Sequence, residues 1–330
     1  MLPADMARTE KARTEKDGPA ARSEGGNASD PGAFALLDAR RRAEATLSVC
    51  LPARNEEATV GHIVGTVRRE LVERVPLVDE ILVLDDGSTD ATAAAASDEG
   101  ARVVDVGSIL TEYSAGHGKG AALWKGLYAA RGDLVCFIDA DIRNFGAHFV
   151  TRLLAPLLID QSVEFTKGFY RRPLHGEPSG GGRVTELMAR PLLSYLFPRL
   201  ADIVQPLAGE YAGRRRALEA VPFAYGWGVE FSLLVDIAAA FGRESIAQVD
   251  LGAREHRNRP LDQLGVPALA ILATALRRAG LQQVGPEVAE LIRFGDDDHE
   301  LERIAVELRE LPPIVNLPEY RAKFGREQSA

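Results

Sequence analysis

The chain has 330 residues, of which 46% are hydrophobic, and it carries a formal net charge of −9 at pH 7. This hydrophobic content is enough to bury the core of one large domain or of two joined lobes. Nucleic acids and anionic membranes would repel such a chain, so its composition excludes a general binder of either polyanion and requires local cations for any phosphate ligand.

The first segment, residues 1–32, contains a tandem Ala-Arg-Thr-Glu-Lys repeat at 7–11 and 12–16 and then a stretch rich in Gly, Ser, Asn and Asp. Such a composition buries too little apolar surface to offset the entropy of ordering. We therefore predict that this segment is a disordered tail.

From Leu47 onward, short apolar runs alternate with amphipathic segments, which is typical of an α/β fold with a mostly parallel central sheet. The predicted strands cover 47–51, 81–84, 102–106 and 134–138, and the predicted helices cover 57–73, a segment beginning near Ser88, and 121–130. The alternation ends near Phe165, and beyond it we predict mainly helices and one short strand at 246–251.

These patterns divide the chain after the tail into three parts. We predict a first half at 33–170, a second half at 171–265 and a helical C-terminal extension at 266–330. The extension is expected to form helices at about 266–279, 286–294 and 299–309 that cover the core or make a dimer surface.

Membrane contact is not expected, because no apolar run approaches the roughly 18 residues of a membrane span and the polar start lacks the core of a signal peptide. The two cysteines, Cys50 and Cys136, each lie in an apolar strand-like run. Buried thiols of this kind favour a cytoplasmic location over a disulfide framework.

Polar clusters follow the predicted strands, and in an open α/β sheet such clusters meet in one crevice. Asp139-Ala140-Asp141 comes directly after an apolar strand, where carboxylates can bind Mg²⁺ or Mn²⁺ together with diphosphate oxygens. The alternative is an ordinary solvated pair, since the Asp-x-Asp pattern is common.

Two more clusters follow the first strands. In Asp85–Asp90, Asp86 is a candidate acceptor for the N–H edge of a nucleotide base, although capping of the next helix explains Ser88 and its neighbours. In Pro52–Glu57, Glu56 and exposed backbone groups are candidates for base and ribose contacts; the alternative is a plain helix N-terminus with acidic residues.

Three loops carry candidate ligands for anions or metal. Lys119 lies between two glycines at the start of a helix, where it could bind a diphosphate; the alternative is a lysine on a surface loop. The loop lacks the other Walker A residues, which disfavours an ATPase. His256 in the run 255–260 is a candidate metal ligand or a structural histidine. The run 180–185 contains three glycines followed by Arg183 and Thr185, which could form an anion site; the alternative is a flexible loop.

These motifs, in their order, resemble a known family, the actinobacterial glucosyl- and mannosyl-3-phosphoglycerate synthases, which are retaining glycosyltransferases with the GT-A fold. The resemblance spans about 47–265, and its most specific motifs are Gly-Gly-Gly-Arg-Val-Thr-Glu-Leu at 180–187 and His-Arg-Asn-Arg-Pro at 256–260. It implies transfer of a hexose from a nucleotide diphosphate sugar to 3-phosphoglycerate, with a divalent metal, Mg²⁺ or Mn²⁺, and a homodimer. The first half would bind the nucleotide sugar and the second half the acceptor.

The resemblance also implies roles for particular residues. Asp141 and His256 would be metal ligands, and Asp141, Lys119 and Glu230 would be catalytic. The nucleotide sugar would contact Pro52, Ala53, Asn55, Glu56, Asp86, Lys119, Asp139, Ala140, Trp227 and Glu230. The phosphoglycerate would contact Gly182, Arg183, Thr185 and Asn258.

Two residues depart from the mycobacterial glucosyl branch, which has serine at Asp86 and tyrosine at Trp227; the glycine loop is also shorter. A carboxylate accepts from both N–H groups of guanine, so Asp86 favours a guanine nucleotide without excluding UDP. Other interpretations are a polyprenyl-phosphate glycosyltransferase, which needs membrane contact, and a non-catalytic nucleotide-sugar-binding protein. A dehydrogenase is disfavoured because no Gly-x-Gly-x-x-Gly follows the first strand.

Overall fold

The computed structural model describes residues 31–114, 116–174, 177–180, 182–255, 260–281, 287–294 and 300–325. Its main sheet contains the strands β1 (Leu47–Ala53), β2 (Glu80–Asp85), β3 (Arg102–Asp105), β4 (Leu134–Phe137), β5 (Phe165–Arg171), β8 (Tyr211–Arg214) and β10 (Ile246–Ala253). Their order is β10-β5-β8-β4-β1-β2-β3, and β8 alone runs antiparallel to its two neighbours. The predicted mostly parallel α/β fold is therefore confirmed.

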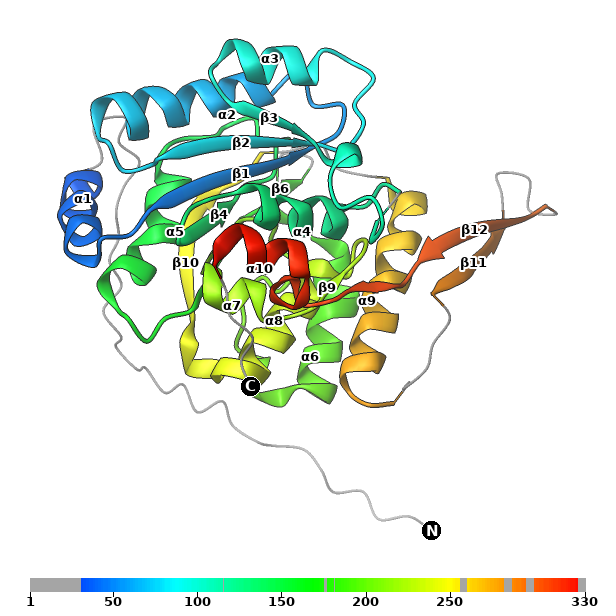
Figure 1. Cartoon of the computed structure of the whole chain (residues 1–330). Helices are drawn as coiled ribbons and strands as arrows, with labels where there is room; N and C mark the ends of the chain where they lie inside the picture. The colour runs from blue at the N-terminus through cyan, green and yellow to red at the C-terminus, as the bar shows by residue number, and fades with distance from the viewer. Residues whose placement is uncertain are drawn as a thin grey trace, which may run out of the picture.

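Helices cover both faces of this sheet (Figure 1). One face is packed by α1 (Pro31–Ala43), α2 (Val60–Val67) with its π-helical continuation η1 (Arg68–Arg74), α3 (Thr92–Asp98) and α5 (His148–Ile159). The other is packed by α4 (Lys119–Ala129), α6 (Arg190–Leu196), α7 (Arg215–Glu219), α8 (Val229–Phe241), α9 (Gly265–Arg278) and α10 (Pro318–Phe324).

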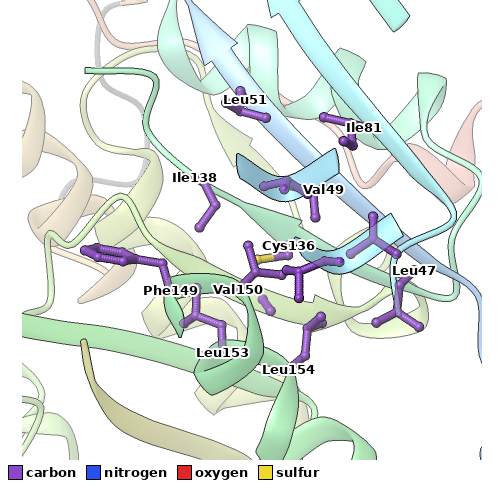
Figure 2. Close-up of a cluster of buried hydrophobic side chains, with 14 of the residues drawn as sticks. Leu47, Val49, Leu51, Ile81, Cys136, Ile138, Phe149, Val150, Leu153 and Leu154 are labelled. Atoms are coloured by element: carbon purple, nitrogen blue, oxygen red, sulfur yellow. The ribbon is translucent and has the colours of Figure 1, made fainter. Parts of the chain in front are cut away.

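The two cores take alternate side chains of the buried strands, as strand geometry requires. Val49 and Leu51 of β1 point to the α5 side, where Phe149 and Leu153 meet them (Figure 2). Cys50, between them, points to the opposite core. Both faces are covered, so the residues of β1 are apolar on both sides, except for the buried Ser48, whose hydroxyl donates to Glu80.

Cys50 and Cys136 are both fully buried and both free. They lie on adjacent strands, but Cys136 belongs to the α5-side core and Cys50 to the other, so the sheet separates the two thiols. Burial raises the pKa of each thiol well above its ordinary value. Neither side chain is therefore a reactive thiolate at neutral pH.

The C-terminal extension differs from the prediction. The helix at 266–279 is confirmed as α9, but the helices predicted at 286–294 and 299–309 are wrong: these segments form the strands β11 (Val288–Phe294) and β12 (Leu301–Glu307). They pair as an antiparallel hairpin, called the arm below, which extends from the body (Figure 1).

The reason lies in contacts distant in sequence. Alternate arm residues such as Leu291 and Val306 face α9, while cross-strand ion pairs join Arg293 to Glu302 and Arg303 to Glu290, each at 2.7 Å. A short segment with mixed apolar and charged residues is compatible with the period of a helix and with that of a strand. Tertiary packing then decides which of the two forms.

Two short strand pairings and several single-turn helices complete the fold. The pair β9 (Phe223–Ala224) and β13 (Glu310–Leu311) ties the C-terminal segment to the second half, and β6 (Pro173–Leu174) pairs with β7 (Glu177–Gly180). The single-turn helices are η2 (Val106–Ser108), η3 (Thr185–Ala189), η4 (Pro198–Leu200), η5 (Arg243–Ser245), η6 (Leu261–Leu264) and η7 (Ile314–Asn316).

Two of the predicted segment boundaries can be compared with the observed elements. Residues 1–30 of the predicted tail lie outside the described residues, while Pro31 already begins α1. The boundary at 170/171 falls inside β5, and the sheet takes β8 and β10 from the second half. Within the described residues, none of the helices has both the length and the apolar character needed to cross a bilayer.

Candidate active site

The carboxyl ends of β1, β2, β4 and β10 open on one pocket of about 590 Å³. Its wall contains most of the residues that the sequence predicted: Pro52, Ala53, Glu56, Asp86, Lys119, Asp139, Ala140, Asp141, Gly182, Arg183, Thr185, Trp227 and Glu230. The parallel pairing of β1 with β2 and β4 explains the convergence, because it brings three strand ends to the same edge.

Asp139, two residues beyond β4, is held by two cations. Lys119 Nζ donates to Oδ1 at 2.7 Å and Arg254 donates to Oδ2 at 2.9 Å. Burial favours the neutral acid, but the two cations outweigh it and hold the pKa of Asp139 below its ordinary value. Gly209 lies against this carboxylate so closely that a Cβ at position 209 would be 2.2 Å from Oδ2.

Asp141 is more open than Asp139. Its Oδ1 accepts a hydrogen bond from Arg254 at 2.6 Å, its side chain is 29% exposed, and its Oδ2 has no donor in the described part of the chain. An ionised oxygen that faces a pocket suits a hard cation, which binds one or two carboxylates and completes its shell with water and phosphate oxygens.

The donor set also fits this type of cation. No group of three His, Cys, Asp or Glu side chains with metal-binding geometry exists among the described residues, and His256, the predicted second ligand, lies outside them. A site with few protein ligands leaves coordination positions for substrate oxygens, as Mg²⁺ sites at phosphates commonly do.

Lys119, the first residue of α4, makes a second ion pair at 2.7 Å, with Glu230 at the start of α8. Burial works to lower the pKa of Lys119, but the carboxylates of Asp139 and Glu230 outweigh it, and the pKa is well above its ordinary value. Lys119 therefore joins the β4 side of the pocket to the α8 side.

Arg254, one residue after β10, is buried with 4% of its side chain exposed. Besides the two aspartates it contacts the Tyr170 hydroxyl at 2.9 Å and lies 3.4 Å from Glu210, whose side chain is fully buried. Burial raises the pKa of Glu210, and the Arg254 charge opposes this rise. A single guanidinium thus fixes three carboxylates and a hydroxyl, a geometry that its fork of donors allows.

Among the predicted site residues that the structure describes, Asn55 is the one that does not line the pocket. It adopts a left-handed backbone conformation, with φ of 57°, and its Oδ1 accepts the Thr89 N–H at 2.8 Å. The Asn55 N–H donates to Ser88 Oγ at 3.0 Å. The side chain therefore joins the loops after β1 and β2, and its predicted contact with a nucleotide stays a prediction; the neighbouring Arg54 lines the pocket.

The predicted acceptor residues surround the start of η3. Gly182 has φ of 81°, a conformation that favours glycine, and its carbonyl accepts the Glu186 N–H at 3.0 Å. Arg183 and Thr185 follow it in the pocket wall. Asn258, the fourth predicted acceptor residue, lies outside the described residues.

The loop before α8 forms the opposite wall with Tyr225 and Trp227. Its position depends on two distant segments: the Ala121 N–H donates to the Tyr225 carbonyl at 2.9 Å, and the Arg309 guanidinium lies 4.0 Å from the Tyr225 ring centre. The arm contributes Glu307 to the same wall. The C-terminal extension is thus part of the pocket and not only a cover.

Comparisons with known proteins agree with this geometry. Residues 48–173 match the glycosyl transferase family 2 profile. The glucosyl-3-phosphoglycerate synthase of Petrotoga mobilis is 42% identical over 303 residues, which are 89% of this chain and 93% of that protein. The Mycolicibacterium smegmatis synthase is 47% identical over 281 residues, 84% of this chain and 91% of that protein.

The chain belongs to the glucosyl-3-phosphoglycerate synthase family.

A solved member of this family extends the match to the fold. The glucosyl-3-phosphoglycerate synthase of Mycobacterium tuberculosis, in complex with Mn²⁺, UDP and glucosyl-3-phosphoglycerate, has a TM-score of 0.78 and 43% identity, covering 89% of this chain and 97% of that one. The same enzyme with Mn²⁺, UDP-glucose and phosphoglyceric acid has a TM-score of 0.77, covering 88% and 96%. The predicted family and the GT-A fold are confirmed.

Sequence reasoning missed some pocket residues of this glucosyl-3-phosphoglycerate synthase family member. They include Arg54, His117, Arg172, Tyr225 and Arg254. For Arg54, Arg172 and Arg254 a signal was present, because each is a charged residue directly after a strand. His117 and Tyr225 lie on loops whose direction depends on distant contacts.

Proposed function

We propose that the chain is a retaining glucosyl-3-phosphoglycerate synthase that transfers glucose from a nucleotide diphosphate sugar to 3-phosphoglycerate in the presence of a divalent cation. The observation that carries this proposal is the position of the Asp139–Asp141 pair and the Arg183–Thr185 segment on one pocket. One end offers carboxylates to a metal-bound diphosphate, and the other offers a cation and a hydroxyl to a phosphorylated acid.

The charges of the pocket support the same assignment. Its wall carries five cationic side chains, Arg54, Lys119, Arg172, Arg183 and Arg254, and six carboxylates, Glu56, Asp86, Asp139, Asp141, Glu230 and Glu307. Two polyanionic substrates therefore need an added positive charge. A divalent cation held by Asp141, with His256 as the second proposed ligand, would supply it and act as a Lewis acid on the diphosphate.

In the proposed reaction, the bond between the anomeric carbon and the β-phosphate oxygen breaks and a bond to the acceptor's C2 oxygen forms on the same face of the sugar. The acceptor's hydroxyl proton passes to the departing diphosphate. Glu230 and Asp139 are tied to Lys119, which favours roles in orienting the sugar over nucleophilic attack. Arg183, Thr185 and Asn258 would orient the acceptor, and alignment of the reacting atoms supplies much of the rate.

The deciding experiment is a donor panel. Purified protein is incubated with 3-phosphoglycerate and UDP-glucose, GDP-glucose, ADP-glucose or GDP-mannose, with Mg²⁺, Mn²⁺ or EDTA, and kcat/KM is measured for each donor. We expect transfer of glucose, loss of transfer in EDTA, and an α-linked product by NMR. The predicted mannosyl activity is tested by the GDP-mannose arm. No transfer from any donor would reject the proposed function.

We also propose a cytoplasmic location, which the two free buried thiols support.

We further propose a homodimer that forms through the arm. One face of the arm exposes Val288, Ile292, Phe294 and Leu301, with exposures of 49%, 51%, 66% and 55%. The register puts Phe294 directly opposite Leu301. The same face carries the Glu290–Arg303 ion pair, and exposed apolar side chains around such a pair suit a second copy related by a two-fold axis. Light scattering should give a dimer, and Phe294→Ser with Leu301→Ser a monomer; a wild-type monomer would contradict the proposal.

A further inference from the structure

A histidine that the sequence did not single out lies at the nucleotide-base end of the pocket. His117 lines the pocket with Asp86, and its Nδ1 is 3.1 Å from Asp86 Oδ1. The other oxygen of Asp86 accepts the Gly118 N–H at 3.1 Å. A carboxylate only accepts hydrogen bonds, so the hydrogen of this contact belongs to His117 Nδ1.

The surrounding backbone is shaped to allow this contact. Gly87 follows Asp86 in a left-handed conformation, with φ of 73°, and a Cβ at position 87 would lie 2.6 Å from His117 Cε1. A side chain at position 87 would displace the imidazole from its observed position, and glycine leaves room for it. The chain brings His117 and Gly118 to Asp86 from the loop before α4, so each oxygen of the carboxylate has its own donor.

The two side chains differ in accessibility. The Asp86 side chain is 13% exposed and that of His117 is 54% exposed. Burial raises the pKa of Asp86, while the hydrogen bonds from His117 and Gly118 favour its ionised form. His117 therefore stabilises a mostly buried carboxylate and fixes its orientation, but remains open to the pocket.

An oriented carboxylate distinguishes bases by the polarity of their ring nitrogens. Uracil N3–H and guanine N1–H are donors next to a carbonyl oxygen, whereas the corresponding ring nitrogens of cytosine and adenine carry a lone pair. Each Asp86 oxygen has a lone pair left for a ring N–H after its first donor, and this lone pair repels a ring nitrogen without hydrogen. A polar group that is built to pair with a ligand rejects ligands that leave it unpaired.

We propose that His117 is a specificity-determining positioning residue that holds Asp86 in the geometry for accepting a ring N–H, so that the pocket selects uracil or guanine nucleotides over cytosine and adenine nucleotides. This inference rests on the proposed function only in that the pocket binds a nucleotide. It adds the residue that makes the selection, and it does not require sugar transfer.

The test is the binding of UDP, GDP, CDP and ADP to the full chain with Mg²⁺, measured by calorimetry. The variants are His117→Ala, which removes the donor, and His117→Asn, whose side-chain N–H can replace Nδ1–H. His62→Ala, on the exposed side of α2, is the matched control. Melting temperatures establish that each variant is folded.

We expect wild type to bind UDP or GDP at least about tenfold more tightly than CDP and ADP, as one hydrogen-bond mismatch implies. His117→Ala should weaken the preferred nucleotides by about tenfold and leave CDP and ADP nearly unchanged, while His117→Asn should retain most of the preference. His62→Ala should resemble wild type.

Two results would overturn the inference: an unchanged ratio of UDP to CDP affinity in His117→Ala, or an equal loss for all four nucleotides, which would indicate a structural role. These results are separate from the transfer assay. Base preference that depends on His117 in a protein that transfers no glucose would reject the proposed function and leave this inference standing.

Discussion

Two parts of the pocket are built differently: its centre, and the end at Asp86 that is proposed to bind the nucleotide base and is called the base end below. At the centre, Asp139 and Asp141 are fixed by Lys119 and Arg254, which are mostly buried and also contact Glu230 and Glu210. At the base end, Asp86 is held by one backbone N–H and by a half-exposed histidine. The centre joins β4, β10, α4 and α8, whereas the base end joins two loops. A change of a buried member of the centre, such as Arg254, should therefore affect catalysis and folding together, and a change of His117 should affect selectivity alone.

The largest effect on catalysis is expected for Asp141→Ala. Loss of this carboxylate removes the proposed metal ligand and should lower transfer by about 1000-fold, the scale of losing a main electrostatic contact to the transition state. Electron paramagnetic resonance should detect weaker Mn²⁺ binding. Because the side chain is 29% exposed, the melting temperature should change little.

Asp98→Ala, an exposed substitution on α3, is the control for this variant and should leave both measurements unchanged. Metal-stimulated transfer at the wild-type rate in Asp141→Ala would remove this residue from the metal site and would weaken the contrast between the two ends.

Arg254→Gln should affect folding as well as transfer. The substitution leaves the fully buried Glu210 without its cation, and breaking a buried pair in this way costs about 3 kcal/mol of unfolding free energy. We expect a drop of about 100-fold in kcat, because Asp139 and Asp141 lose the donor that orients them. Urea unfolding and steady-state kinetics measure the two effects.

Arg254→Lys restores the charge but not the fork of donors, so it should recover more stability than activity. Full activity in both Arg254 variants would show that the centre does not depend on this guanidinium, and that the two ends of the pocket are more alike than the contacts indicate.

The smallest catalytic effect is expected for Asn55, which lies near the base end but outside the pocket wall. Asn55→Ala should lower the unfolding free energy by about 1 kcal/mol, because alanine is strained at a φ of 57° and the contact with Thr89 is lost. The KM for the donor should stay within about twofold of wild type, since the contact does not reach the pocket.

Asn55→Gly, which relieves the backbone strain, should recover part of this stability. An increase in donor KM of tenfold or more in both variants would restore Asn55 to the nucleotide site, as the sequence had predicted.

The front half of the fold could be predicted because its signals are local. Apolar runs define β1, β2 and β4, and parallel pairing alone brings the residues that follow them to one edge, as for Asp86 and Asp139. The family motifs then identified the segment around Arg183, whose place in the pocket depends on packing that no local pattern describes.

The failures share a physical cause, which is dependence on distant partners. The arm forms strands because β11 and β12 pair with each other and pack on α9. The position of Asn55 likewise depends on its bonds to the loop after β2 and on its left-handed backbone, while its predicted contact with a nucleotide stays a prediction. The contact of His117 with Asp86 depends on the glycine at position 87.

The two thiols buried on opposite faces of the sheet have a practical consequence. Neither Cys50 nor Cys136 should react with maleimides in the folded protein, since both are inaccessible and protonated. A single cysteine introduced on the arm, for example Glu290→Cys, would therefore be the unique labelling site in an otherwise unmodified chain. Spin labels at that position would report the separation of two arms directly, without prior removal of native cysteines.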